Sequence, residues 1–456
     1  MDLVIAGGTV VTGSGSARCD VGVETGRIVA LGHGLRGERV IDARERLVLP
    51  GGVDPHVHFT PASAAYAWVD DFGSGSRAAA VGGVTTVGNM TSARDHETLR
   101  DAAARTRLQG EAESLLDFFL HPIVRPARPA DVDDVVELAG AGHASVKLFL
   151  SDPAFDHHLD TCLRAMGAAS TYGMTVVVHC EDHAVLAQRT GCLVAAGRDD
   201  VHAYAESRPD YAEAIAVARA AGLARAAGAR LYIVHLSSQA ALEEARRARR
   251  RGQAVLVETR PEYLLLTRAK LDGPDGALYV GAPPLREAAD VEALWTGLAS
   301  GAIQAMGSDH APWMRHQKLD PGLSLASLRQ GLAVVDLMLP LLFARGVMTG
   351  RLSLERFVAV TATNPARIFG LAPRKGTIAI GADADLVVWD PETRWSPTES
   401  GRETRSDSNI YAGWSLHGRP QVTVSRGTVV VDRGEVVERS PRGRFLAARG
   451  GDGAVV

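Results

Sequence analysis

The sequence has few lysines, few cysteines and no long hydrophobic run, and each absence narrows the classes of protein to consider. Apolar stretches are interrupted by arginine or glycine well before the ~18 residues that a transmembrane helix needs, so we expect no membrane span. The N-terminus lacks a basic segment followed by an apolar core, so we expect no signal peptide. The four cysteines form no C-x-x-C pair, which favours reduced thiols and a cytoplasmic location.

Neither sign of charge dominates the chain. The formal net charge is −4 over 456 residues, which gives no reason to expect nucleic acid or an acidic membrane as a partner. This length suggests one large domain with a smaller one beside it. Basic charge is nearly all arginine, which makes the position of each lysine informative. The lysines are Lys147, Lys270, Lys318 and Lys375.

The two ends of the chain are rich in β-forming residues. Short apolar stretches fill residues 1–49, and "ETGR" at 24–27 between two of them is typical of a β-hairpin. Similar stretches fill residues 373–440. We therefore predict one small sheet domain built from both ends, followed by an extended tail over 441–456.

The middle of the chain, residues 50–372, alternates apolar strands with helical stretches rich in Ala, Arg and Glu. This pattern predicts an α/β fold with a parallel sheet covered by helices, and eight such units fit a closed (β/α)₈ barrel. An open doubly wound sheet is the alternative, but no G-x-G-x-x-G follows the first strand. The predicted strands are 51–59, 82–90, 115–123, 143–150, 174–180, 230–236, 253–263 and 302–310.

Polar side chains stand at the ends of several of these strands. Residues two apart in a strand point to the same side, so His56 and His58 share a face. The carboxyl ends of barrel strands meet at one mouth, where His179, His235 and Asp309 would join them. Four imidazoles and a carboxylate at one mouth predict a transition-metal site.

Lys147 lies inside the apolar stretch "SVKLFL", at the end of the fourth predicted strand. A buried ammonium tends to lose its charge, and a neutral amine can react with CO₂ to give a carbamate, which is chemically a carboxylate. Six ligands are too many for one tetrahedral zinc ion but suit two divalent metals sharing a bridge. The alternative is a lysine whose ammonium reaches the water at the barrel mouth.

Two metals about 3.5–4 Å apart can hold a hydroxide between them at neutral pH. Asp309 is placed to accept its proton during attack and to pass that proton to a leaving nitrogen. Hydrolysis of a carbonyl–nitrogen bond follows as the predicted reaction. Phosphoester hydrolysis would also suit two metals, so these residues alone leave the substrate open.

A set of motifs then resembles one family, in the same order along nearly the whole chain. They are "PGGVDPHVHF", "VGGVTTV", "VKLFL", "VVVHCED", "YIVHLSS", "VETRPEYLLLT", "GAPPLR", "GSDHAPW" and "TATNPARIFGL". The chain is similar to the amidohydrolase superfamily, in its cyclic amidohydrolase branch of hydantoinases and dihydropyrimidinases, with allantoinase and dihydroorotase as relatives.

This resemblance implies a (β/α)₈ barrel with a small β-sandwich and a binuclear centre, usually of zinc. It implies that His56, His58 and Asp309 hold one metal, that His179 and His235 hold the other, and that carboxylated Lys147 bridges them. Members open cyclic amides, ureides or imides and commonly form homodimers or homotetramers.

Several positions depart from the patterns of that branch. The arginine that dihydroorotases carry just after H-x-H is missing from "HVHFTPAS", which disfavours their substrate. The tyrosine that hydantoinases carry five residues after the bridging lysine is Asp152, so the group that polarises the scissile carbonyl is not identified. The serine before "PPLR" is Ala282, and Gln330 corresponds to a substrate-facing asparagine.

Three further residues are candidates for substrate contact. Tyr66 and Trp68 lie in the long stretch after the first barrel strand and could close over a substrate, or simply pack as a surface loop. His310 follows Asp309 and could support the metals, contact the substrate or simply pack.

The predicted function is a binuclear metal-dependent hydrolase that opens a small cyclic amide or ureide. An allantoinase-like or dihydroorotase-like activity is the nearest alternative. An N-acyl amino acid hydrolase and a non-catalytic scaffold of the same fold are less favoured, because all six predicted ligands are present and "ETRPEYLLLT" and "GAPPLR" point to the cyclic branch.

Overall fold

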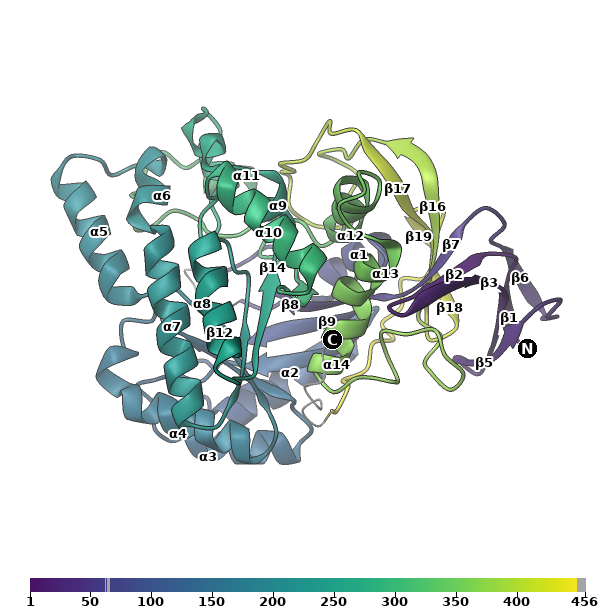
Figure 1. Ribbon diagram of the computed structural model, residues 1–456, viewed down its shortest axis with the longest axis horizontal. Helices are drawn as coiled ribbons and strands as arrows, with labels where there is room; N and C mark the ends of the chain where they lie inside the picture. Colours follow the sequence, from purple (N-terminus) through teal and green to yellow (C-terminus); the bar gives the residue numbers. More distant parts are fainter. Residues whose placement is uncertain (62, 64–65, 449–456) are drawn as a thin grey trace.

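The computed structural model describes residues 1–61, 63 and 66–448. Figure 1 shows two bodies: a barrel surrounded by helices on the left, and β-sheets made from the first and last parts of the chain on the right. Within the described residues, no helix has both the length and the apolar character needed to span a membrane.

Parallel strands form the barrel. They lie in a three-stranded sheet of order β10-β9-β8 and a five-stranded sheet of order β11-β12-β13-β14-β15. Parallel bridges between Ile123 and Lys147 and between Val57 and His310 join the edges of these sheets into a ring. The strands are β8 (Gly52–Val57), β9 (Val84–Thr91), β10 (Asp117–Pro122), β11 (Ser145–Phe149), β12 (Thr175–His179), β13 (Arg230–Ile233), β14 (Val255–Thr259) and β15 (Ala305–Met306).

The strands are almost continuously buried because the ring packs side chains inside and helices outside. The helices run over α1 (Phe72–Val81), α2 (Leu99–Glu113), α3 (Asp131–Gly140), α4 (Leu159–Thr171), α5 (His183–Ala195), α6 (Tyr204–Ser207), α7 (Asp210–Ala226), α8 (Gln239–Arg250), α9 (Pro261–Leu265), α10 (Ala288–Ser300), α11 (Arg315–Lys318), α12 (Met338–Leu342), α13 (Leu354–Val358) and α14 (Asn364–Ile368).

Helix α8 shows how the sequence specifies these helices. Ser238 caps its N-terminus by accepting a hydrogen bond from Ala241 N, and arginines fill its last turn, where the carbonyl ends of the helix favour positive charge. Its buried residues recur every three or four positions, so one narrow face of small side chains packs onto the barrel. They are Ala241, Leu242, Ala245 and Ala248.

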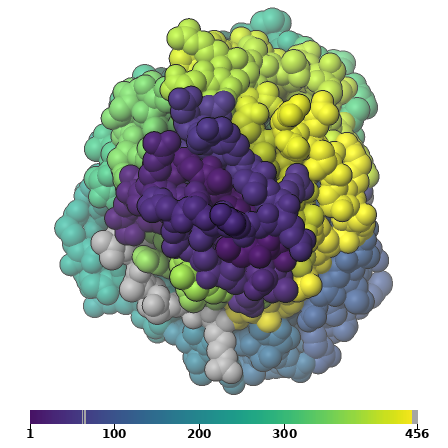
Figure 2. All heavy atoms as spheres, turned by 90° about the vertical axis from the view of Figure 1, so that its right-hand side faces the viewer, coloured from purple at the N-terminus to yellow at the C-terminus, as the bar shows by residue number. Residues whose placement is uncertain are grey.

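Two sheets form the β-sandwich. One has the order β5-β4-β1-β6, and the other the order β19-β18-β17-β16-β7-β2-β3, so strands from both ends of the chain share the second sheet. Figure 2 shows the N-terminal segment lying directly against C-terminal segments on this face. The strands are β1 (Leu3–Ala6), β2 (Thr9–Thr12), β3 (Gly15–Arg18), β4 (Asp20–Glu24), β5 (Arg27–Gly32), β6 (Arg39–Asp42), β7 (Leu47–Pro50), β16 (Leu386–Trp395), β17 (Leu416–Ser425), β18 (Thr428–Asp432) and β19 (Glu435–Val436).

The fold class predicted from the sequence is confirmed, a TIM barrel with a β-sandwich, and so is the hairpin, in which Glu24 pairs with Arg27. Most predicted barrel strands were a few residues too long, and two of them extended well beyond the observed strand. The strand predicted over 253–263 ends at Thr259, because Pro261 begins helix α9. The strand predicted over 302–310 is reduced to Ala305–Met306, after which Gly307 N still donates to the Thr259 carbonyl and His310 forms a single bridge with Val57.

The described part of the tail, 441–448, lies along the barrel strand β10. Phe445 forms a parallel bridge with Phe118, and Leu446 N donates to the Phe118 carbonyl over 2.8 Å. The rest of the predicted extended tail lies outside the described residues.

Candidate metal centre

The strand ends bring the predicted ligands together at one mouth of the barrel. His56 lies in β8, Lys147 in β11 and His179 at the end of β12. His235 and Asp309 follow β13 and β15. All six predicted ligands, His58 included, are at least nine-tenths buried.

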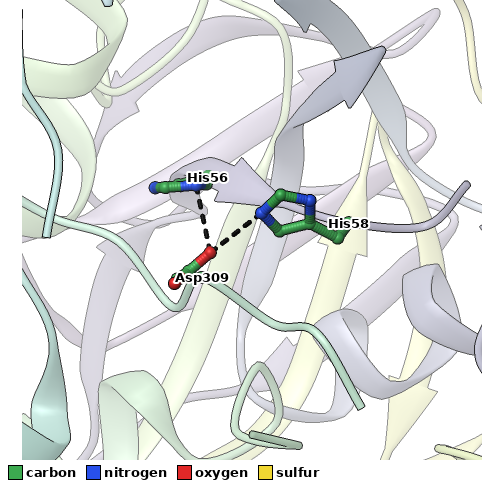
Figure 3. Close-up of side chains that lie close together, drawn as sticks. All are labelled: His56, His58 and Asp309. Atoms are coloured by element: carbon green, nitrogen blue, oxygen red, sulfur yellow. Dashed lines mark hydrogen bonds and ion pairs between the residues drawn. The ribbon is translucent and has the colours of Figure 1, made fainter. Parts of the chain in front are cut away.

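His56, His58 and Asp309 form the first ligand group (Figure 3). Asp309 Oδ1 lies 3.0 Å from His56 Nε2 and 2.9 Å from His58 Nε2. Donor atoms around one tetrahedral zinc ion are roughly 3.3 Å apart, given metal–ligand bonds of about 2.0–2.1 Å. The spacing of this buried group therefore suits one metal ion.

The orientation of His56 supports the same conclusion. Its Nδ1 lies 3.0 Å from Glu258 Oε1, so the ring proton is assigned to Nδ1 and a lone pair remains on Nε2. That lone pair faces the Asp309 carboxylate, and two acceptors at 3.0 Å need a cation or a proton between them. Glu258 itself is fixed by Tyr232, whose hydroxyl donates to Oε2 over 2.8 Å. Carboxylates that orient metal-binding histidines in this way are common in metalloproteins.

His179 and His235 form a second ligand group. His179 Nδ1 lies 3.0 Å from His235 Nε2, while His179 Nε2 lies 2.9 Å from Glu181 Oε2. Arg208 donates to both oxygens of Glu181 and holds that carboxylate in place. The ring centroids of His56 and His235 are 5.4 Å apart, so the two ligand groups are neighbours.

Lys147 is fully buried at this mouth, with its amine 4.7 Å from the centre of the Phe149 ring. Among the described residues, Nζ has no hydrogen-bond partner. Burial lowers the pKa of Lys147 to about 8. Because buried polar groups are nearly always paired, an isolated amine here indicates that something else satisfies it.

The backbone is strained at two of the ligands. His235 has φ +38° and Asp309 has φ +46°, in the left-handed region that residues with a side chain rarely adopt. Such conformations cost on the order of 1–3 kcal/mol each and concentrate at functional sites. Both ligands therefore adopt a backbone conformation that favours glycine, where the chain leaves β13 and β15.

Asp309 also contacts Arg260, whose guanidinium donates to Oδ2. Although burial opposes it, contact with His56 and Arg260 holds the pKa of Asp309 well below its ordinary range. The sequence analysis, which searched the carboxyl ends of the barrel strands for polar residues, did not single out Arg260, Glu181 or Glu258. All three stand next to predicted ligands or at the end of β14, so the same search applied to every polar residue there would have found them.

The structure places two of the predicted substrate contacts over the first ligand group. The Trp68 ring centroid lies 4.4 Å from that of His58, and Tyr66 lies 6.0 Å from Trp68 with 43% of its surface exposed. Trp68 therefore covers one side of the site, and Tyr66 stands at its edge.

His310 has both ring nitrogens occupied by protein groups. Nε2 lies 2.8 Å from Asp70 Oδ2, and Nδ1 accepts from Val334 N and Val335 N over 3.1 and 3.2 Å. His310 therefore joins the loop that holds Asp70 to the backbone at 334–335, and neither ring nitrogen is left for a substrate.

No described hydrogen bond joins the predicted metal ligands to the three remaining candidates for substrate contact, Asp152, Ala282 and Gln330. Asp152 Oδ1 accepts from Ala154 N over 2.8 Å within its own turn. The Gln330 carbonyl accepts from the Trp313 indole over 2.8 Å. Ala282 lies between two carbonyls that accept from buried tyrosine hydroxyls, those of Gly281 and Pro283.

The fold and the ligand groups together define a metal-binding TIM-barrel protein with a buried centre at its strand ends. The model of the Amidohydrolase family matches residues 47–430. The chain belongs to the amidohydrolase family, as the sequence motifs predicted.

Known relatives match nearly the whole length of this chain. A D-hydantoinase of Ralstonia pickettii is 36% identical over 98% of this chain and 99% of its own. The solved structure of a D-hydantoinase from Bacillus sp. AR9 superposes with a TM-score of 0.94 at 34% identity, covering 98% of this chain and 99% of the other. That of a dihydropyrimidinase from Brevibacillus agri gives a TM-score of 0.94 at 33% identity over 99% of both chains.

Proposed function

We propose that this protein is a hydrolase that opens the ring of a cyclic amide or ureide, in the manner of a hydantoinase or dihydropyrimidinase. The observation that supports this best is the buried Lys147 amine, which has no hydrogen-bond partner among the described residues, at a mouth that also holds two neighbouring ligand groups. The similarity to D-hydantoinases over the full chain supports the substrate class.

The cofactor we propose is a pair of divalent ions, zinc by preference. His56, His58 and Asp309 would hold one ion, and His179 and His235 the other, with carboxylated Lys147 between them. When bound, such ions supply a water of lowered pKa and polarise a carbonyl oxygen.

The chain's own groups supply the proton transfer. Asp309 accepts the proton of the attacking water and delivers it to the ring nitrogen as the carbonyl–nitrogen bond breaks. Each carboxylate oxygen has two lone-pair sites, so Oδ2 can take part while it is bound to Arg260. Trp68 packs on His58 and limits the access of bulk water to this carboxylate.

A substrate panel tests this proposal directly. The zinc-loaded protein would be assayed with hydantoin, 5-substituted hydantoins, dihydrouracil, allantoin, dihydroorotate and succinimide, following loss of ultraviolet absorbance. We expect at least one ring to open, with the activity abolished by a chelator and absent from Lys147→Ala. Full activity after complete metal removal would contradict the proposal.

We further propose that the protein works in the cytoplasm as a homodimer or homotetramer. Its cysteines are free in the described structure, which suits a reducing compartment. Light scattering coupled to size-exclusion chromatography tests the oligomeric state, and a monomer would contradict that part of the proposal.

A further inference from the structure

Arg260 is a buried arginine that lies behind the first ligand group, between the end of β14 and the start of α9. Only 1% of its surface is exposed. A charged side chain at such depth persists where it is paired on several sides. The guanidinium of Arg260 is paired on three sides, and each pairing restricts where it can move.

Two of the three partners lie in helix α9, and the third follows β15. Nη1 donates to Asp309 Oδ2, Nη2 donates to the Tyr263 hydroxyl, and Nε lies 2.8 Å from Glu262 Oε1. The Tyr263 hydroxyl in turn donates to the Pro283 carbonyl over 2.6 Å. A side chain at Gly281 would place Cβ 3.0 Å from Nη2, so the absence of one there leaves room for the guanidinium.

Glu262 interacts with Arg260 and with no other described side chain through its carboxylate. It is fully buried, and neither carboxylate oxygen has a hydrogen-bond partner among the described residues apart from the ion pair with Arg260. A second carboxylate beside the guanidinium means that Asp309 is not the only group that compensates the buried positive charge of Arg260.

Because of the contact with Arg260, the two oxygens of the Asp309 carboxylate have different partners. Oδ2 is bound by Arg260, whereas Oδ1 lies at 3.0 and 2.9 Å from the Nε2 atoms of His56 and His58. Tilting of the carboxylate about the Cβ–Cγ bond would move Oδ2 away from Arg260 and lose this charge-assisted bond, so the contact fixes the plane of the Asp309 carboxylate.

We propose that Arg260 is a positioning residue that fixes Asp309 so that Oδ1 alone is offered to a metal ion together with His56 and His58. This inference rests on the metal centre of the proposed function. It predicts that loss of Arg260 weakens metal binding and slows the chemical step while substrate binding is kept, because Arg260 acts through Asp309.

Cobalt titration of the metal-free protein provides the main test, since the absorption bands of bound Co²⁺ report its coordination geometry. For Arg260→Met, which keeps the volume and removes the guanidinium, we expect Co²⁺ affinity to fall 10- to 100-fold and the bands to shift. On the substrate found with the panel, kcat should fall with KM nearly unchanged.

Arg249→Met is the matched control. Arg249 donates to the carbonyls of Val255 and Ala302 and to the Gln304 amide oxygen, at the opposite end of the barrel from the ligands. Its loss should lower Tm and leave Co²⁺ affinity and spectrum unchanged. If Arg260→Met behaves like Arg249→Met, Arg260 is only structural and the proposal is wrong.

Two other results would also overturn the proposal. A raised KM with unchanged kcat and Co²⁺ affinity would make Arg260 a substrate contact. An unchanged Co²⁺ spectrum in Arg260→Lys, a charge-conserving variant to use if Arg260→Met does not fold, would show that the planar guanidinium does not orient Asp309. The cobalt readout needs no substrate, so it separates failure of this proposal from failure of the proposed activity.

Discussion

Lys147 is the residue on which the binuclear proposal depends most. Its amine is buried and unpartnered among the described residues, so the site requires a group on that nitrogen or near it. Replacing Lys147 with alanine should remove at least one metal per chain and nearly all activity. Metal analysis by mass spectrometry checks this, with the exposed Lys270→Ala as control. If Lys147→Ala retained both metals, the bridging role would be wrong.

A variant of Glu258 would measure how much a residue that orients a metal ligand contributes to metal affinity. It binds His56 Nδ1 at 3.0 Å and so turns Nε2 toward Asp309. Glu258→Gln keeps the shape but weakens this orientation, and we expect about a 10-fold loss of metal affinity. Glu292→Gln, the same change at a surface pair with Arg351, should have no effect. Equal affinity for both variants would show that Glu258 does not orient His56.

At the scale of elements, the turn after β15 must pass very close to β14. A Cβ atom at Gly307 would lie 2.6 Å from the Glu258 carboxyl carbon. Gly307→Ala should therefore push Glu258 away from His56, lower the free energy of unfolding by about 1–3 kcal/mol and reduce metal content. Denaturant unfolding and metal analysis check both effects.

Gly140→Ala is the control for that variant. A Cβ atom at this residue in α3 would meet nothing within 4 Å, so its effect should stay within about 0.5 kcal/mol. Equal stability and metal content for the two alanine variants would mean that the Gly307 turn can shift without disturbing Glu258.

The sequence predicted the barrel because its strands are continuous apolar runs and because side chains at parallel strand ends must converge. This reasoning placed His56, His179 and Asp309 at one mouth. It could not predict which ring nitrogen faces the metal, since that depends on partners such as Glu258 and Glu181. It also extended one strand through Pro261, because the apolar residues after Thr259 suit a strand as well as a helix.

The loop residues were the least predictable part of the site. Trp68 lies beside His58, as its place shortly after the first strand allows, but its role toward a substrate stays a prediction. The sequence left three roles open for His310, and its bonds to Asp70 and to the backbone at 334–335 favour the third, a packed residue that joins loops. Such contacts join segments far apart in the chain, which local patterns do not encode.

At the scale of the whole molecule, Lys375 joins the barrel to the sandwich. Its Nζ lies 2.7 Å from Asp117, at the start of β10, and 3.1 and 2.5 Å from Asp383 and Asp385, just before β16. Although burial opposes it, these carboxylates raise the pKa of Lys375. The contribution of Lys375 to stability is therefore fully present below the pKa of an unfolded lysine. It is lost only as the pH rises through the pKa of Lys375 in the folded protein.

Lys375→Met should reveal how strongly this group holds the two bodies together. The change leaves buried carboxylates uncompensated, although Arg426 still pairs with Asp117 and Arg374 with Asp383. We expect a loss of about 3–5 kcal/mol in the free energy of unfolding at pH 7.5. Lys270→Met, at an exposed residue, should change it little.

The pH dependence of the same variant tests the cause of that loss. Burial already raises the pKa of Asp385, and without Lys375 it should rise further, so the folded state would bind a proton that the unfolded state does not hold near neutral pH. The stability of Lys375→Met should therefore increase as pH falls from 7.5 to 5.5, relative to the unmodified protein. Urea unfolding at both pH values measures this difference. A constant difference would mean that the lost stability comes from packing at the join and not from the uncompensated carboxylates.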